Sequence, residues 1–382
     1  MTLKAKHSAA PLNIFTTMSS LAKETQAYNL SQGLPDYPVA PELGTLLQEA
    51  VAKGYNQYAP MPGLMELRQS IATYFNRIYQ SDYCTEHNIT IIPGATYGIF
   101  TAFAALLEKG DEVIYLEPAF DCYVPAIEIN GGIPVCVRLD EKKNFEVDWQ
   151  RIQDAITSKT KAILINTPHN PTGRVWQQED WDQLAGIIGQ KDIYVVADEV
   201  YNTILFDGHR HIPGYLQEDL QEKIISVYSF GKMHHITGWK IGFCIAGAAI
   251  TAAFRSVHQY LSFSVNTPAQ YALAAYINLP KADNEASLFL QEKRDLLLNG
   301  LAGSKFRSRF TTQGSYFQLF DYSTLSPLPD VKFAQWLTIN HKVATIPLSA
   351  FYKTQPHIPQ IRLSFAKNDA VLNAAVKILS DL

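Results

Sequence analysis

Seven short apolar runs, separated by helical patterns, constrain most strongly what this chain can fold into. Each run is continuous rather than alternating, which is typical of strands that are buried on both faces. The runs are ITII (89–92), EVIYL (112–116), PVCVRL (134–139), KAILI (161–165), IYVVA (193–197), IISVY (224–228) and IGFCIA (241–246). The alternation of strands with helices favours an α/β fold, in which a mostly parallel sheet of seven strands is covered by helices.

The C-terminal third of the chain shows a different pattern. Helical stretches bracket a short strand-like run, SYFQLFD, and a second run, IRLSF, precedes a helical C-terminus. This pattern predicts a smaller α+β domain, with the aromatic side chains of SYFQLFD in its core. We expect three parts: an N-terminal segment (1–35) that packs on the small domain, a large domain (36–280) and the small C-terminal domain (281–382).

Charge and composition exclude several classes of protein. The net charge is −4, so no basic field indicates a nucleic-acid partner. No apolar run approaches the length of a membrane span, and the N-terminus lacks the pattern of a secretory signal. The four cysteines lie far apart, which favours a reducing cytoplasm. His234 and His235 are adjacent and have no acidic or Cys partner at a ligand spacing, so we expect no metal site.

Polar residues directly follow five of the apolar runs. They are Gly94-Ala95-Thr96, Phe120-Asp121, Asn170, Asp198 with Tyr201, and Ser229 with Lys232. In an open parallel sheet the carboxyl ends of the strands lie along one edge, where ligands bind. We therefore expect these side chains to converge on one crevice.

Each of these features alone has an ordinary structural explanation: a turn, a salt bridge or a solvated lysine. Together they match the needs of pyridoxal 5'-phosphate (PLP). A helix that starts at Gly94-Ala95-Thr96 offers free N–H groups to a phosphate. A carboxylate such as Asp198 at a buried strand end needs a cationic or hydrogen-bonding partner, and a protonated ring nitrogen would be one. Lys232 offers an amine to the aldehyde.

Longer motifs extend the match over nearly the whole chain. They are NQYAPMPGLMELR, EPAFDCYVP, NTPHNPTG, ADEVY, SFGKMHHITGWKIG and GSYF. With these motifs the chain resembles the fold-type I, class I/II PLP-dependent aminotransferases. It is most similar to the branch that holds kynurenine aminotransferases, glutamine transaminase K and bacterial methionine aminotransferases.

The resemblance implies a role for each matching residue toward the cofactor. Lys232 matches the Schiff-base lysine, Asp198 the partner of the pyridine nitrogen, and Asn170 and Tyr201 the donors to the phenolate oxygen. Phe120 matches the aromatic that stacks on the ring. The phosphate cup corresponds to Ala95, Thr96, Ser229 and Lys240. Lys232, Asp198 and Tyr201 are thereby the expected catalytic residues.

The resemblance also implies contacts with the substrate and with a second subunit. Arg362 matches the arginine that grips the substrate α-carboxylate, Gly33 lies in the loop that closes over that carboxylate, and Asn170 adjoins it. Tyr58 matches a tyrosine that reaches the phosphate in the neighbouring subunit. A homodimer with shared active sites is therefore expected.

The expected reaction moves an amino group from a neutral L-amino acid to a 2-oxo acid by a ping-pong mechanism. The donor would be methionine, an aromatic residue, glutamine or kynurenine. Relatives that accept acidic substrates use a second arginine, yet residues 257–270 contain no Arg or Lys, and we expect a helix to point Arg255 elsewhere. The apolar candidates for the side-chain pocket are Phe15, Leu34, Tyr97, Val265 and Phe351.

Alternative functions stay open at this point. One alternative is a broad side-chain pocket with little preference among amino acids, because one methylene more or less in an apolar pocket changes the rate only modestly. A PLP-dependent lyase that cleaves the Cβ–S bond of cysteine conjugates would use nearly the same site. A ligand-sensing domain of a transcription regulator shares the fold, but that role requires an added DNA-binding domain, for which the chain has only a short N-terminal segment.

Overall fold

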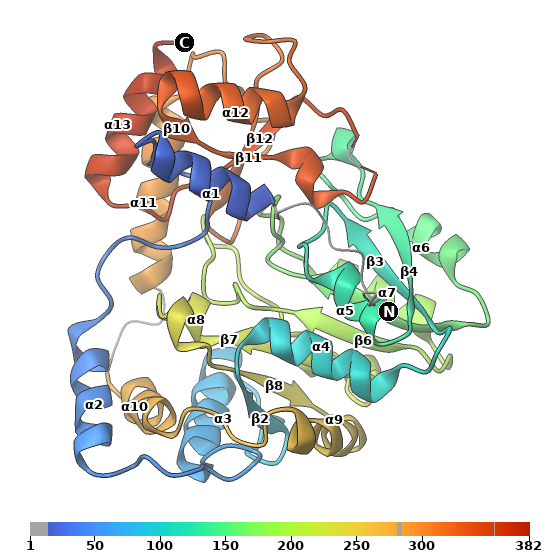
Figure 1. Cartoon of the computed structure of the whole chain (residues 1–382). Coiled ribbons are helices and arrows are strands. Elements are labelled where there is room, and N and C mark those ends of the chain that lie inside the picture. Colours follow the sequence, from blue (N-terminus) through green and yellow to red (C-terminus); the bar gives the residue numbers. More distant parts are fainter. Residues whose placement is uncertain (1–13, 281–284, 355) are drawn as a thin grey trace, which may run out of the picture.

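The large part of the chain is built around one sheet (Figure 1). The structure is a computed structural model that describes residues 14–280, 285–354 and 356–382, and within these ranges the sheet has seven strands. They coincide with the predicted apolar runs: β2 (Ile89–Ile92), β3 (Glu112–Glu117), β4 (Ile133–Arg138), β5 (Thr160–Asn166), β6 (Tyr194–Asp198), β7 (Ile224–Ser229) and β8 (Gly242–Ala246). The predicted α/β fold is confirmed.

The strand order brings the polar strand ends to one edge. The order is β2-β8-β7-β6-β5-β3-β4. The pairs from β7 to β4 are parallel, whereas β8 is antiparallel to both β7 and β2. Because β8 runs in the reverse direction, β2 points the same way as β7. The first residues of β8 therefore meet the carboxyl ends of the other strands.

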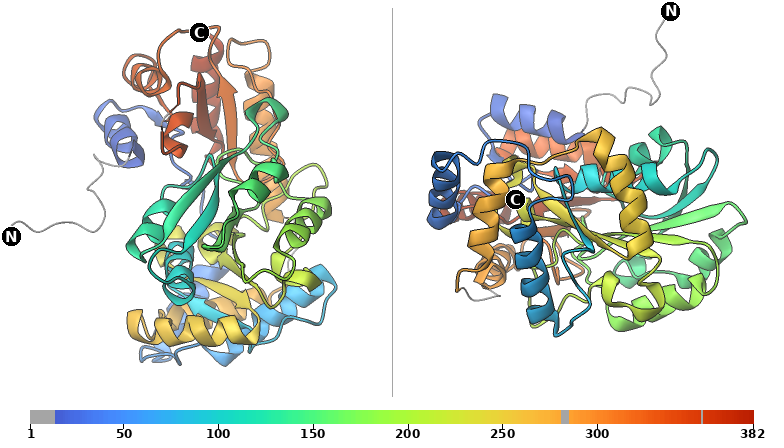
Figure 2. Two further views of the ribbon diagram at one scale, coloured as in Figure 1. Left: turned by 90° about the vertical axis from the view of Figure 1, so that its right-hand side faces the viewer. Right: turned by 90° about the horizontal axis from the view of Figure 1, so that it is seen from below.

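Helices cover both faces of the sheet (Figure 2). Side chains along each strand alternate between two cores: Val113 and Tyr115 belong to one, and Ile114 and Leu116 to the other. The first core is closed by α4 (Ala95–Leu106), α5 (Tyr123–Ile129) and α9 (Ala248–Leu261). The second core is closed by α3 (Met65–Tyr79), α6 (Trp149–Ala155), α7 (Gln178–Ile188) and α10 (Thr267–Ile277), which α2 (Pro41–Ala52) contacts. Burial on both faces explains why the strands are continuously apolar.

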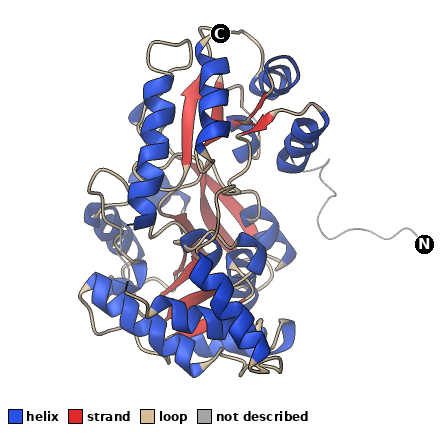
Figure 3. Ribbon diagram, turned by 90° about the vertical axis from the view of Figure 1, so that its left-hand side faces the viewer, coloured by secondary structure: helices blue, strands red, loops and turns tan. Residues whose placement is uncertain are grey.

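A smaller unit follows α10 and lies at the top of Figure 3. Its antiparallel sheet has the order β11-β12-β9 and packs with three helices. Its elements are α11 (Glu285–Gly300), β9 (Phe317–Asp321), α12 (Asp330–His341), β10 (Val343–Ala344), β11 (Ile346–Pro347), β12 (Gln360–Ser364) and α13 (Asp369–Ser380). Residues 281–284, directly after the proposed boundary at residue 280, lie outside the described residues.

The N-terminal part of the described chain contacts this smaller unit. Helix α1 (Ile14–Glu24) packs against α12, and β1 (Tyr28–Asn29) pairs in parallel with β10. Residues 1–13 of the proposed N-terminal segment lie outside the described residues. Within the described ranges, no helix is both long enough and apolar enough to span a membrane.

Candidate active site

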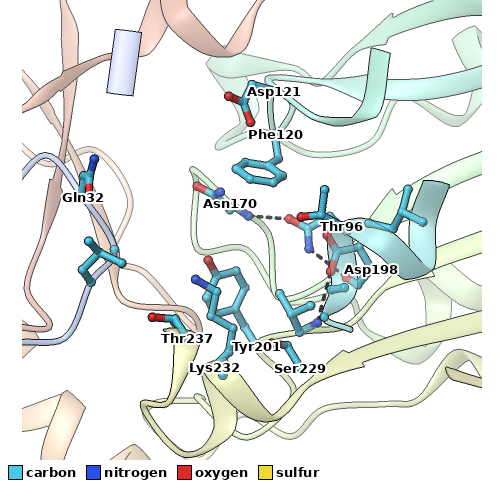
Figure 4. A pocket seen from close by; sticks show the side chains of 18 of the residues that line it. Gln32, Thr96, Phe120, Asp121, Asn170, Asp198, Tyr201, Ser229, Lys232 and Thr237 are labelled. Atoms are coloured by element: carbon cyan, nitrogen blue, oxygen red, sulfur yellow. Dashed lines mark hydrogen bonds between the residues drawn. The ribbon is translucent and has the colours of Figure 1, made fainter. Parts of the chain in front are cut away.

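A cavity of about 390 Å³ lies at the sheet edge where the strand ends meet (Figure 4). Phe120 and Asn170 face Lys232 and Tyr201 across it, and Thr96 lies beside Asp198 near the start of α4. The structure brings nearly all of the sequence-predicted site residues to its wall: Gly33, Ala95, Thr96, Phe120, Asn170, Asp198, Tyr201, Ser229, Lys232, Lys240 and Arg362. Residues from both the large sheet and the smaller unit thus share one site.

Asp198 is a buried carboxylate at the end of β6. Only 5% of the residue is exposed. Its Oδ2 accepts a hydrogen bond from the Tyr123 hydroxyl at 2.6 Å, and its Oδ1 accepts one from the Val200 N–H at 3.3 Å. Burial raises the pKa of Asp198 to about 6, although these two bonds and the charge of Lys232 act in the opposite direction. The carboxylate therefore favours a cationic partner inside the cavity.

This burial predicts how the stability of the cofactor-free protein depends on pH. The carboxyl titrates at pH 3.8 when unfolded and near 6 when folded, so ionisation favours the unfolded state as pH rises through this window. Above pH 6 the cost is about 3 kcal/mol. We expect Asp198→Asn to raise the free energy of unfolding at pH 8 by up to that amount, while abolishing activity.

Urea unfolding of the cofactor-free protein at pH 8 and near pH 5 checks this prediction. The gain should shrink to roughly half near pH 5, where the native carboxyl is largely protonated. Asp219→Asn, at an exposed position, is the matched control and should change neither value. A gain that is equal at both pH values would contradict the burial argument.

Arg362 is a buried cation that enters the cavity from β12. It is 2% exposed, and its guanidinium lies 3.7 Å from the centroid of the Phe317 ring. Nη1 donates to Asn170 Oδ1 at 2.8 Å and Nη2 to the Ser31 carbonyl at 2.9 Å, while the buried Nε has no hydrogen-bond partner. Within the described ranges no carboxylate forms a salt bridge with it, and burial lowers its pKa to about 10. This end of the cavity therefore favours an anion.

Lys232 lines the same cavity as the two buried charges of Asp198 and Arg362. It belongs to the short helix α8 (Phe230–Met233), which follows β7 directly. Its Nζ donates to the Tyr316 hydroxyl at 2.9 Å. The aromatic residues of SYFQLFD belong to the core of the smaller unit as predicted, but two of them also reach the site: Tyr316 contacts Lys232, and Phe317 lines the cavity. The small domain packs on the sheet edge, so its apolar core continues into the site.

The start of α4 forms the third chemical feature of the cavity. Gly94 precedes the helix with a φ of +87°, a conformation that favours glycine. A Cβ at this position would lie 3.3 Å from Lys240 Nζ. The helix N-terminus and this cation are thus adjacent, and both attract an anionic group. Lys240 reaches this point because it lies just before the reversed strand β8.

Tyr58 is the predicted site residue that the structure places away from the cavity of its own chain. It is 82% exposed and packs edge-on against Phe263, with ring centroids 5.6 Å apart. Tyr260, at 89% exposure, lies in the last turn of helix α9. Tyr58 and Phe263 thus form an exposed aromatic pair outside the cavity.

The proposed apolar lining is only partly found at the cavity of this chain. Phe15 and Leu34 line it, and Phe351 stacks near Arg362 without belonging to the wall. Tyr97 instead contacts His258 Nδ1 at 2.8 Å, and Val265 is buried in the large core. The helix direction of α4 explains Tyr97, because adjacent residues on a helix point to different sides.

Several cavity residues were not singled out from the sequence. Asn166 accepts from the Asn170 N–H and donates to the Asp198 carbonyl, so it fixes the two loops relative to each other. Tyr123 supplies the bond to Asp198, and its place in the motif EPAFDCYVP is the signal that could have found it. Further examples in the cavity wall are Gln32, Thr237 and Phe317. Among the described residues no cluster of three His, Cys, Asp or Glu side chains is arranged to hold a metal ion.

The chain is similar in sequence and structure to known aminotransferases. The sequence model of the family "Aminotransferase class I and II" matches residues 25–379. A methionine aminotransferase from Escherichia coli is 45% identical over 374 residues, covering 97% of this chain and 95% of that protein. A kynurenine–oxoglutarate transaminase from Dictyostelium discoideum is 32% identical, covering 95% and 92%.

The structural comparison agrees. The crystal structure of an Escherichia coli protein with a methionine aminotransferase function matches with a TM-score of 0.95 at 43% identity, and the match covers 100% of both chains. Identity at this level over the full length shows common ancestry as well as a common fold. The chain therefore belongs to the class I and II aminotransferase family.

Proposed function

We propose that this aminotransferase binds PLP and transfers an amino group from a neutral amino acid, methionine above all, to a 2-oxo acid. One observation carries the proposal: a buried anion, a buried cation and a lysine amine line one cavity, and neither Asp198 nor Arg362 has an ion-pair partner among the described residues. The ring nitrogen of PLP would supply the cation that Asp198 lacks, and the carboxylate of an amino-acid substrate would supply the anion that Arg362 lacks.

The donor set also fits the remaining parts of the cofactor. Lys232 would hold PLP covalently, Asp198 its ring nitrogen, and Asn170 and Tyr201 its phenolate oxygen. Phe120 would stack on the ring, and Ala95, Thr96, Ser229 and Lys240 would bind the phosphate at the start of α4. When bound, PLP supplies an electron sink for the pair left on the substrate α-carbon.

The residues of the chain handle binding and proton transfer. Arg362 orients the substrate carboxylate through its planar fork, which positions the α-hydrogen. The Lys232 amine would take the substrate α-proton as general base and would give a proton back later in the amino-group transfer. Asp198 keeps the ring nitrogen protonated. The same steps in reverse on a 2-oxo acid complete a ping-pong cycle.

The substrate preference rests on the arrangement around Arg255. This arginine lies on α9 and donates to Thr90 Oγ1 at 2.9 Å and to the carbonyls of His87 and Ile89. Its guanidinium is thus committed to the start of β2 and does not line the cavity. With no second arginine available from residues 257–270, a substrate side-chain carboxylate would be buried without a charge partner.

We therefore predict that kcat/KM for methionine exceeds that for aspartate by at least about 100-fold, since an unpaired buried charge costs several kcal/mol. Both are measured with one common oxo-acid acceptor. Arg255→Lys is the control and should leave the ratio unchanged. Equal rates for the two substrates would show that a cation that we have not identified reaches the side-chain pocket.

The proposed homodimer rests on Tyr58. Its exposure, together with that of Tyr260 and Phe263, leaves an aromatic surface that a second copy would cover. We propose that Tyr58 reaches the phosphate of the partner's cofactor. The cytoplasmic location inferred from cysteine usage stays a prediction.

Mixing two inactive variants tests the shared site. Chains with Tyr58→Ala and chains with Lys232→Ala are each expected to be weakly active or inactive alone. A mixed dimer would hold one intact site, so statistical exchange should restore about a quarter of wild-type activity. If Tyr58 served its own chain, no mixed dimer would contain an intact site and mixing would restore nothing.

A further inference from the structure

Tyr316 links the catalytic lysine to the segment that covers the cavity. Its hydroxyl accepts a hydrogen bond from Lys232 Nζ at 2.9 Å and donates one to the Gly33 carbonyl at 2.8 Å. The residue is fully buried. Gly33 belongs to residues 31–34, which we call the cover segment: Gln32, Gly33 and Leu34 line the cavity, and the Ser31 carbonyl accepts from Arg362. Lys232 and Arg362 are thus connected by hydrogen bonds through the cover segment, Lys232 by way of Tyr316.

The contact between the cover segment and Tyr316 depends on a glycine. A Cβ on Gly33 would lie 2.5 Å from Cε2 of Tyr316 and 2.6 Å from Cζ of Phe317, which is closer than real Cβ contacts. Only a residue without a side chain lets the backbone rest on both rings. The Gly33 carbonyl therefore reaches the Tyr316 hydroxyl only while the segment is fully seated.

The direction of the hydrogen bonds decides what Tyr316 does to the amine. A phenol has one proton to donate, and a carbonyl can only accept. While the Tyr316 hydroxyl donates its only hydrogen bond to the Gly33 carbonyl, its oxygen can only accept a hydrogen bond from Lys232. The amine is thus held through an N–H group, and its own lone pair is left free.

We propose that Tyr316 is a positioning residue that makes Lys232 competent as a base only when the cover segment is seated over the substrate carboxylate. The proposal rests on the proposed role of Lys232. In proton abstraction the Cα–H bond breaks, an N–H bond forms with the lysine lone pair, and the electron pair left on Cα passes to the bound cofactor. When the segment lifts, the Tyr316 hydroxyl loses its bond to the Gly33 carbonyl and donates to the lysine lone pair instead. The lone pair is then occupied, and proton abstraction is blocked.

The test compares two matched variants, Tyr316→Phe and Tyr322→Phe. Tyr322 is also fully buried in the smaller unit, and its hydroxyl donates to the Leu328 carbonyl at the same 2.8 Å, but it does not contact Lys232. Each variant therefore loses one buried hydroxyl and one bond to a carbonyl. General destabilisation should change the measured quantities in both variants, whereas loss of the bonds from Tyr316 to Lys232 and Gly33 should change them only in Tyr316→Phe.

Two measurements are needed. The first is the deuterium isotope effect on kcat for methionine labelled at the α-carbon. It should rise in Tyr316→Phe as proton transfer slows and kcat falls by about 10-fold, the upper range for the loss of one neutral hydrogen bond. The second is amide hydrogen exchange of residues 31–37 in the cofactor-free chain, which should become faster. Neither value should change in Tyr322→Phe.

An increase in both quantities supports the coupling, and an increase in only one or in neither overturns it. Covalent capture of PLP by the wild-type chain, trapped by reduction and located at Lys232, is checked first, because its absence would instead refute the proposed function. If Tyr316→Phe does not fold, Gly33→Ala is used in its place. That change lifts the segment from the Tyr316 ring and should raise the same isotope effect.

Discussion

Lys232→Ala is expected to lower kcat for methionine by at least about 10³-fold, because general base catalysis alone contributes 10²–10⁴-fold and the covalent attachment of the cofactor is lost as well. Lys232, Asp198 and Arg362 line one cavity, and Lys240, the other lysine of its wall, lies against the start of α4, so another side chain would have to move to replace the amine. Single-turnover kinetics with methionine measures the loss directly.

Two controls separate this effect from misfolding. Lys332→Ala removes an exposed lysine on α12 and should leave kcat unchanged. The visible absorption of the wild-type protein with PLP should depend on pH, whereas that of Lys232→Ala should match PLP held without a covalent bond. A Lys232→Ala protein with wild-type transamination would refute the assignment of the base and of the attachment point.

Arg362→Lys is expected to lower kcat/KM for methionine by on the order of 10²-fold. Lysine keeps a positive charge but loses the planar fork that a carboxylate fits, in which two separate nitrogens of Arg362 bond Asn170 and Ser31. Most of the effect should fall on KM, because the carboxylate grip also acts in the ground state. The PLP spectrum should stay unchanged, since Arg362 is not proposed to contact the cofactor.

A substrate without a carboxylate makes this test specific. For 3-(methylthio)propylamine, which is methionine without its carboxyl group, the wild type should already be slow, and Arg362→Lys should slow it by less than about 3-fold. If the variant lost activity equally on both amines, Arg362 would act on the shape of the site and not on the carboxylate.

Local pattern was sufficient for the sheet and for most of the site. The apolar runs became strands to within a residue or two, because burial on both faces demands continuous apolar sequence. Residues such as Asp198, Asn170 and Lys232 then had to meet, since parallel strands end at one edge. Whether a strand is buried on both faces depends on the few residues of that strand, so a short stretch of sequence is enough to predict it.

Contacts between distant parts of the chain were not accessible in this way. The aromatic run that holds Tyr316 has the apolar character of a core strand, and only the packing of the smaller unit on the sheet edge turns its hydroxyl toward Lys232 and Gly33. Tyr123 similarly reaches Asp198 across 75 residues of chain. Such bonds depend on the relative placement of whole elements, which is set by the sum of many weak packing contacts and by no local signal.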